Sequence, residues 1–380
     1  MQHDSKLPEV GTTIFSIMSN LAKKHNAINL SQGFPDFGSD QKLIDLVSKA
    51  MNSCYNQYAP ITGNLELREA IAKKINSLYN VSYQIENEIT ITAGATQAIS
   101  TILSAFIRQD DEVIIFKPAY DSYEPGIKLN GGKVIPIQLL APSFSVDWDD
   151  VNSKINSKTK MIIINTPHNP SGTVFSKEDM LALERITKNT NIIVLSDEVY
   201  EHMVYDGEKH QSASLFPDLK SRSFVVASFC KTFHNTGWRV GYCCAPKELM
   251  ELFMQVHQFS VFCVHHPTQK GIADYMQEPK NYLELPAFYQ KKRDLFLSLI
   301  KDSRFTFTPS KGTYFQVLDY SKITQEHDVD FAKKLTREFG LASIPLSVFN
   351  ENNLDNKLLR FCFAKKDDTL KRAAEILNHI

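Results

Sequence analysis

Short, nearly continuous apolar runs alternate along the chain with stretches whose apolar residues recur at helical spacing. The apolar runs predict strands at residues 89–93, 112–117, 133–139, 160–165, 191–196, 224–228 and 240–245. Helical patterns fit between several of these runs, as at 177–188. Because strands covered on both faces are apolar throughout, we predict an α/β fold with a mainly parallel, seven-stranded sheet between layers of helices.

The two ends of the chain show different patterns. Residues 1–10 are typical of an extended arm, and Thr12 or Thr13 is the expected cap of a helix that runs to about residue 24. Further helices are predicted over 41–53, 65–79, 287–300 and 329–339, strands over 305–308, 312–318 and 358–363, and a last helix at the C-terminus. We expect residues 41–280 to form a large domain, and residues 1–40 and 281–380 to form the N-terminal arm and a small α+β domain.

Composition excludes several classes of partner. The 42 basic residues nearly balance the 43 acidic ones, so we expect no nucleic acid and no anionic membrane surface as a partner. No apolar run approaches the length of a membrane span, and the polar N-terminus lacks the apolar core of a signal peptide. The six cysteines form no CxxC pair and no metal-like spacing, which favours reduced thiols in a cytoplasmic protein without a bound metal.

Polar residues of unusual kinds follow the predicted strands. Asp197 ends the apolar run 191–196, and Ser228 and Lys231 follow the run 224–228. In open α/β sheets, ligands bind beyond the carboxyl ends of the strands. Taken singly, Asp197 fits a structural acid and Lys231 a surface lysine, and Ser228 with Arg239 is unremarkable. Their joint placement at strand ends favours a binding site.

The chemistry of these residues matches one cofactor. Lys231 can form a Schiff base with an aldehyde, and Asp197 can keep a pyridine nitrogen protonated. Ser228 and Arg239 can bind one phosphate, and the turn Gly94-Ala95-Thr96 opens a helix whose free N–H groups favour a phosphate. Tyr200 and Asn169 can donate to a phenolic oxygen. Pyridoxal 5'-phosphate (PLP) carries all of these groups.

Three segments also carry a family resemblance. Residues 165–172 (NTPHNPSG), 196–200 (SDEVY) and 228–241 resemble the signatures of class I/II PLP-dependent aminotransferases of fold type I. Residues 11–14 with 29–37, 231–241, 312–315 (GTYF) and 344–347 (IPLS) are most similar to the methionine and kynurenine aminotransferase branch. The resemblance covers nearly the whole chain and implies the fold predicted above.

The resemblance also implies a role for each matching residue. Lys231 matches the lysine that binds the cofactor aldehyde, Asp197 the partner of the pyridine nitrogen, and Asn169 and Tyr200 the donors to the phenolic oxygen. The phosphate contacts match Ser228, Arg239, Gly94, Ala95 and Thr96.

Other matches concern the substrate and a partner subunit. Tyr120 matches the ring that stacks on the pyridine, Arg360 the arginine that binds the substrate α-carboxylate, and Gly33 a backbone contact to the same carboxylate. Phe15 matches an aromatic position of the substrate pocket. Tyr58 matches a tyrosine donated to the phosphate of the partner subunit, which implies a homodimer with shared active sites.

The substrate is the least determined feature. A dicarboxylate-specific aminotransferase needs a second cation, whereas the segment 257–267, expected to be a loop donated by the partner, has no arginine or lysine and offers Phe259 and Phe262. These aromatic residues fit either an apolar pocket or plain packing, and His265 and His266 fit the pocket rim better than a metal site. We therefore expect ping-pong transamination between a methionine-like or aromatic amino acid and a 2-oxo acid.

Alternative functions share part of this pattern. A PLP-dependent carbon–sulfur β-lyase, for example one acting on cysteine S-conjugates, would use nearly every cofactor contact named above. A non-catalytic regulator with the same fold would need a DNA-binding extension, for which the short N-terminal segment offers no room. Metal hydrolases, P-loop proteins and dinucleotide-binding proteins are disfavoured because HExxH, GxxxxGK[ST] and GxGxxG are missing from the sequence.

Overall fold

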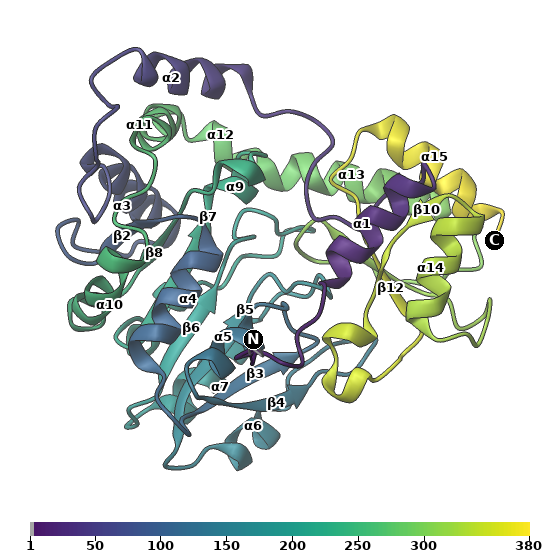
Figure 1. Ribbon diagram of the computed structural model, residues 1–380, viewed down its shortest axis with the longest axis horizontal. Coiled ribbons are helices and arrows are strands. Elements are labelled where there is room, and N and C mark those ends of the chain that lie inside the picture. Colours follow the sequence, from purple (N-terminus) through teal and green to yellow (C-terminus); the bar gives the residue numbers. More distant parts are fainter. Residues whose placement is uncertain (1–3) are drawn as a thin grey trace.

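A seven-stranded sheet forms the centre of the protein, for which a computed structural model describes residues 4–380 (Figure 1). The strand order is β2-β8-β7-β6-β5-β3-β4, and all neighbours are parallel except β8, which is antiparallel to β2 and β7. The strands are β2 (Ile89–Thr92), β3 (Glu112–Lys117), β4 (Lys133–Gln138), β5 (Thr159–Asn165), β6 (Ile193–Asp197), β7 (Ser223–Ser228) and β8 (Gly241–Cys244). The predicted mainly parallel, seven-stranded sheet is confirmed.

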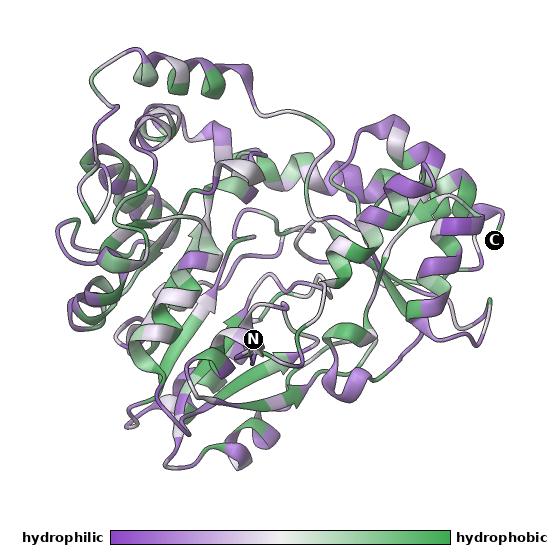
Figure 2. Cartoon of the chain, in the orientation of Figure 1, coloured by the Kyte–Doolittle hydropathy of each residue, from purple (hydrophilic) through white to green (hydrophobic). Residues whose placement is uncertain are grey.

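Both faces of this sheet are buried, which explains the continuous apolar runs. Side chains alternate between the faces of a strand. Ile163 and Leu195 belong to the core cluster under α4, α5 and α10, whereas Ile162, Ile164 and Val194 belong to the main core on the other face. Figure 2 shows the central strands as largely hydrophobic, while the surrounding helices mix hydrophobic and hydrophilic residues.

Capping side chains fix several helix boundaries. Thr13, rather than Thr12, caps α1, because its hydroxyl accepts from the backbone N–H of Ser16. Asn64 caps α3 in the same way. The helices are α1 (Ile14–Lys24), α2 (Gln41–Met51), α3 (Leu65–Tyr79), α4 (Ala95–Phe106), α5 (Tyr123–Leu129), α6 (Trp148–Lys154), α7 (Lys177–Thr187), α8 (Pro217–Lys220), α9 (Phe229–Thr232), α10 (Lys247–Ser260), α11 (His266–Tyr275), α12 (Lys280–Leu283), α13 (Leu285–Ile300), α14 (Asp328–Glu338) and α15 (Asp367–Asn378).

A second, smaller sheet lies in the C-terminal part of the chain. It has the order β11-β12-β9, in which the central β12 (Leu358–Cys362) is antiparallel to both β9 (Phe315–Asp319) and β11 (Ile344–Pro345). The short strand β1 (Ile28–Asn29) pairs in parallel with β10 (Leu341–Ala342), and α1 packs beside α14 (Figure 1). We propose from this pairing that residues 1–40 join 281–380 in one domain and that 41–280 form the other; residues 1–3 lie outside the described part.

Two expectations about secondary structure were wrong. Residues 305–308 are not a strand: Thr306 forms an isolated bridge with Asp319, and beyond it the backbone N–H groups of Lys311 and Gly312 donate to the carbonyl of Gly172 rather than extending a ladder. The segment 257–267 is not one long loop. Helix α10 continues to Ser260 and α11 begins at His266, so the connection between them is short.

Within residues 4–380, no helix is both long enough and apolar enough to cross a bilayer.

Candidate active site

A cavity of about 250 Å³ lies at the carboxyl edge of β5, β6 and β7. These strands end at Asn165, Asp197 and Ser228, and because they are parallel neighbours their polar ends meet at one edge of the sheet. The lining residues are Phe15, Gln32, Gly33, Ala95, Thr96, Ile99, Tyr120, Asn165, Asn169, Asp197, Val199, Tyr200, Ser228, Lys231, Arg239, Phe315 and Arg360. All site residues predicted from the sequence except Gly94 and Tyr58 are among them.

Lys231 points into this cavity from the short helix α9, which begins where β7 ends. Its amine lies 3.0 Å from the hydroxyl of Tyr314 and 3.2 Å from the carbonyl oxygen of Gly33. Burial lowers the pKa of Lys231 to about 8, because the ammonium form is poorly solvated there. A lysine with a lowered pKa is a better nucleophile and base near neutral pH.

Asp197 is held by hydrogen bonds at the end of β6 and is only 4% exposed. The hydroxyl of Tyr123 donates to one carboxylate oxygen at 2.5 Å, and the backbone N–H of Val199 donates to the other at 3.3 Å. Burial raises the pKa of Asp197 to about 6, and the bond from Tyr123 opposes this shift. A cationic partner would favour the carboxylate form in this place.

Tyr123 is a site residue that the sequence reasoning missed. It begins α5 and is buried, three residues after Tyr120, with the two rings edge to face and 5.7 Å apart. Three-residue spacing at the start of a helix is the signal that would have placed it beside the predicted Tyr120.

We predict that Tyr123→Phe raises the pKa of Asp197 further, because the carboxylate loses its strongest hydrogen-bond donor. The measurement is an NMR titration of carbon-13-labelled aspartate carboxyl groups in protein without cofactor. Tyr83→Phe is the matched control, since that buried hydroxyl pairs with Ser214 at 2.9 Å, outside the cavity. A Tyr123→Phe protein whose Asp197 titrates as in the wild type contradicts the prediction.

Donors gather at the N-terminus of α4. Gly94 precedes the helix with φ of 79°, and no side chain caps the first turn. A Cβ on Gly94 would lie 2.8 Å from a guanidinium nitrogen of Arg239, so glycine allows the arginine to approach the helix end. Ser228, at the end of β7, lines the same cavity. The free N–H groups, the hydroxyl and the guanidinium together form a site suited to a phosphate.

Arg360 supplies the second guanidinium group of the cavity, after Arg239. It is 1% exposed, donates to the side-chain oxygen of Asn169 at 2.7 Å and to the carbonyl of Ser31 at 3.0 Å, and its guanidinium lies over the Phe315 ring at 3.9 Å. The Nε atom of Arg360 is buried without a partner. Such a group needs an anionic partner to offset its burial, and a carboxylate fits its planar fork.

Phe15 and Gly33 complete this end of the cavity. The Phe15 ring lies 5.2 Å from the Arg360 guanidinium, and the side-chain amide of Gln32 donates to the Phe15 carbonyl, which ties α1 to the loop that contains Gly33. A Cβ on Gly33 would meet the Phe315 ring at 2.8 Å, so this close approach requires glycine.

Tyr58 and the aromatic residues of 257–267 lie elsewhere. Tyr58 is 78% exposed and packs edge to face against Phe262, with ring centroids 5.0 Å apart. Phe259 is 87% exposed at the end of α10. Neither Tyr58 nor these phenylalanines line the cavity of their own chain. They form an exposed aromatic surface.

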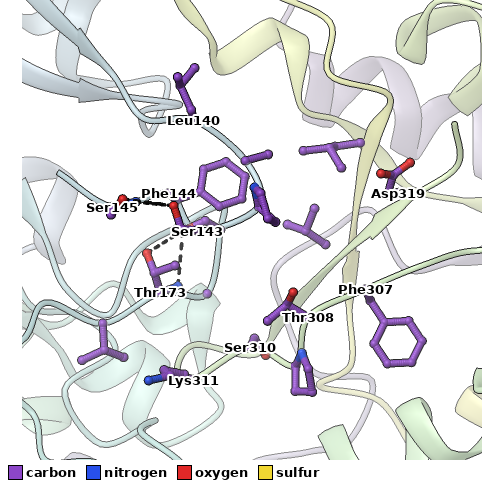
Figure 3. Close-up of a pocket in the computed structure, with 18 of the residues that line it drawn as sticks. Leu140, Ser143, Phe144, Ser145, Thr173, Phe307, Thr308, Ser310, Lys311 and Asp319 are labelled. Carbon is purple, nitrogen blue, oxygen red and sulfur yellow. Dashed lines mark hydrogen bonds between the residues drawn. The ribbon is translucent and has the colours of Figure 1, made fainter. Parts of the chain in front are cut away.

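A larger cavity, of about 910 Å³, lies apart from Lys231 (Figure 3). Figure 3 shows the segment with Leu140 and Phe144 on one side and Phe307 and Asp319 on the other. Apolar side chains and hydroxyl groups dominate its lining, and it contains none of the predicted site residues. The smaller cavity therefore contains the reactive and charged side chains, although the larger cavity has more volume.

A buried ion pair lies next to Tyr200, one of the residues that line the cavity. The Glu201 carboxylate, next to Tyr200, accepts from Lys74 of α3 at 2.5 Å and from Tyr242 of β8 at 3.0 Å. Both charged side chains are almost completely buried. Removal of one partner would leave an unpaired buried charge, so this network fixes the end of β6 relative to its neighbours.

Comparison with known proteins agrees with this geometry. The family model for aminotransferase class I and II matches residues 25–377. The methionine aminotransferase of Escherichia coli is 46% identical over 377 residues, which cover 99% of this chain and 98% of that protein. A crystal structure described as an E. coli methionine aminotransferase superposes with a TM-score of 0.98 over 100% of both chains.

More distant relatives carry other names. A probable N-succinyldiaminopimelate aminotransferase of Mycobacterium tuberculosis is 32% identical and covers 98% of this chain and 97% of its own length. Human kynurenine–oxoglutarate transaminase 3 is also 32% identical, over 98% of this chain and 89% of its own. The family model and these relatives span nearly the whole chain, which therefore belongs to the class I and II aminotransferases.

Proposed function

We propose that this aminotransferase uses PLP to move the amino group of a methionine-like or aromatic amino acid to a 2-oxo acid. The observation that carries the proposal is the joint placement of the Lys231 amine and the Arg360 guanidinium in one buried cavity, with Asp197 at its base. A lysine and a carboxylate-binding arginine on one cavity suit a reaction at the α-carbon of an amino acid.

The hydrogen-bonding and charged groups of the cavity support PLP as the cofactor. The α4 N-terminus, Ser228 and Arg239 would hold the phosphate, and Tyr120 would cover one face of the ring. Asp197 would face the pyridine nitrogen, whose positive charge would offset the cost of the buried carboxylate. Asn169 and Tyr200 would donate to the phenolic oxygen.

The cofactor and the protein side chains have different tasks in the proposed reaction. Bound PLP supplies an aldehyde that condenses with amines and a ring that accepts electrons from the α-carbon. Arg360 and the backbone of Gly33 hold and orient the α-carboxylate. Lys231 removes the proton from Cα of the donor and later delivers one to Cα of the new amino acid, in two successive half-reactions.

The residues around Arg360 support the substrate class. Besides Lys231, Arg239 and Arg360, no cationic side chain lines the cavity within the described chain, whereas Phe15 and Phe315 do line it. An apolar or aromatic side chain is therefore favoured over a second carboxylate. The name of the E. coli relative points in the same direction.

A homodimer with shared sites is part of the proposal. Tyr58, Phe259 and Phe262 are exposed aromatic residues on one chain, and burial against a second copy would remove their apolar surface from water. Tyr58 would then reach the phosphate of the partner's site.

All six cysteines are free, which supports the cytoplasmic location expected from the sequence.

We predict that methionine and aromatic amino acids are better donors than aspartate by at least about tenfold in kcat/KM, as one mismatched charge in an apolar pocket costs more than about 1.4 kcal/mol. A matrix of amino donors against 2-oxo acid acceptors measures this, with amino acid products quantified. Strong activity with aspartate and none with methionine or aromatic donors contradicts the substrate class. Release of ammonia and pyruvate from cysteine conjugates without an acceptor would indicate a lyase instead.

A further inference from the structure

Tyr314 lies in the segment just before β9 and is fully buried, yet none of the roles described above uses its hydroxyl group. The hydroxyl donates to the carbonyl oxygen of Gly33 and lies 3.0 Å from the Lys231 amine. The same amine is 3.2 Å from the Gly33 carbonyl. Amine, phenol and carbonyl therefore contact one another in pairs, although they come from three distant parts of the sequence.

The Tyr314 ring is held rigidly by its neighbours. It packs edge to face against Tyr200 at 5.1 Å and against Phe315 at 4.9 Å. Its backbone carbonyl accepts from the N–H of Phe363 at 2.9 Å, and the preceding Thr313 donates to Met203 at 3.0 Å. These contacts fix the direction of the phenol, so the amine meets a preformed acceptor rather than a mobile side chain.

The position of the amine has a consequence for the proposed reaction. In the proposed reaction Lys231 would hold the cofactor aldehyde at rest, but its amine would have to be free while it moves the proton at Cα of the substrate. A free lysine side chain has many rotamers, and a misplacement of about 1 Å can cost about a hundredfold in rate. Tyr314 and the Gly33 carbonyl offer the free amine two hydrogen bonds at the edge of the cavity.

We propose that Tyr314 is a positioning residue, whose phenol, with the Gly33 carbonyl, holds the free Lys231 amine beside the substrate α-carbon. The inference rests on the proposed role of Lys231. It assigns a task to the third residue of the GTYF segment, for which the sequence offered a resemblance but no role. It also gives Gly33 two functions, since its carbonyl holds the amine while its N–H is available to the substrate carboxylate.

The test compares Tyr314→Phe with wild-type holoenzyme, using a methionine or aromatic donor in normal and α-deuterated form. We expect kcat to fall about ten- to a hundredfold, KM for the donor to change less than about threefold, and the deuterium isotope effect on kcat to rise, because proton transfer becomes slower than the other steps. A merely structural role would not raise the isotope effect.

Tyr289→Phe is the matched control. This buried tyrosine packs on the Tyr314 ring at 5.8 Å, but its hydroxyl pairs with His234 at 2.8 Å and does not contact Lys231. We expect its isotope effect to equal that of the wild type. An unchanged kcat and isotope effect in Tyr314→Phe would overturn the proposal while leaving the proposed function intact.

A second measurement removes the dependence on one variant. In a Lys231→Ala protein, a small primary amine added to the buffer can take the place of the missing side chain. Tyr314 should help to bind that amine, so Lys231→Ala/Tyr314→Phe should need about tenfold more ethylamine for half-maximal rescue, which corresponds to the loss of one hydrogen bond. Equal rescue in the two backgrounds would also overturn the proposal. Full turnover of Lys231→Ala without added amine would instead refute the proposed function.

Discussion

Replacement of Lys231 by alanine is expected to lower multiple-turnover transamination by at least about a thousandfold. The variant loses the amine that is proposed to bind the cofactor aldehyde and to move the proton at Cα, and general acid–base catalysis alone contributes about 10²- to 10⁴-fold. No other lysine lines the cavity in the described chain, so no neighbour can take over this task. Steady-state assays with a methionine or aromatic donor and a 2-oxo acid measure the loss.

Lys311→Ala is the control for this experiment. Its side chain is 59% exposed and pairs with Glu208 at 2.8 Å, at the rim of the larger cavity, so its loss should leave turnover unchanged. A Lys231→Ala protein that turns over at the wild-type rate would show that the lysine is not the reactive group.

Asp197→Asn is expected to have two opposite effects. Turnover should fall about a hundred- to a thousandfold, because the neutral amide cannot stabilise a protonated ring nitrogen. The cofactor-free protein, however, should become more stable than the wild type at pH 8. Burial raises the pKa of Asp197 from 3.8 to about 6, so ionisation of this carboxyl destabilises the folded state by on the order of 3 kcal/mol.

The sign of the pH dependence follows from proton binding. Between about pH 4 and pH 6 the folded protein keeps the Asp197 proton while the unfolded chain releases it, so stability falls as the pH rises through this window and the loss then stays constant. Urea unfolding of cofactor-free wild type and Asp197→Asn from pH 4 to pH 8 should therefore diverge, whereas the exposed control Asp150→Asn should follow the wild type. Parallel curves for wild type and Asp197→Asn would contradict the raised pKa.

The central sheet could be predicted because its strands are buried on both faces. Residues 112–117 are strand β3 and 65–79 are helix α3, as the apolar patterns indicate. The segment 305–308 could not be placed, because its apolar alternation matches a strand, whereas only Thr306 pairs with Asp319 and the following Lys311 and Gly312 donate to Gly172 through tertiary contacts. The extent of α10 was also not predicted, since its last turn carries the exposed Phe259 rather than a regular apolar stripe.

The residues of the candidate site likewise divide into those that local patterns predict and those that tertiary contacts place. Asp197, Ser228 and Lys231 follow apolar runs, so strand order alone brings them to one edge of the sheet. Tyr314 contacts Lys231 through tertiary packing that no local pattern encodes, whereas only the three-residue spacing from Tyr120 points to the place of Tyr123 beside Asp197. A buried tyrosine hydroxyl otherwise resembles ordinary core in a sequence. Tyr58 does not line the Lys231 cavity of its own chain, so its predicted role depends on a second subunit and stays a prediction.

The pairing of β1 with β10 has a consequence for biosynthesis. All seven strands of the central sheet lie between residues 89 and 244, so Asp197, Ser228 and Lys231 can assemble while the ribosome is still adding the C-terminal third. The hydrogen bond from Arg360 to Ser31, by contrast, joins segments near the two ends of the chain. It forms only after the last strand has left the exit tunnel. The nascent protein therefore gains the residues proposed to bind the cofactor before the site proposed for the substrate carboxylate can form, and truncated chains that are released early lack the second site.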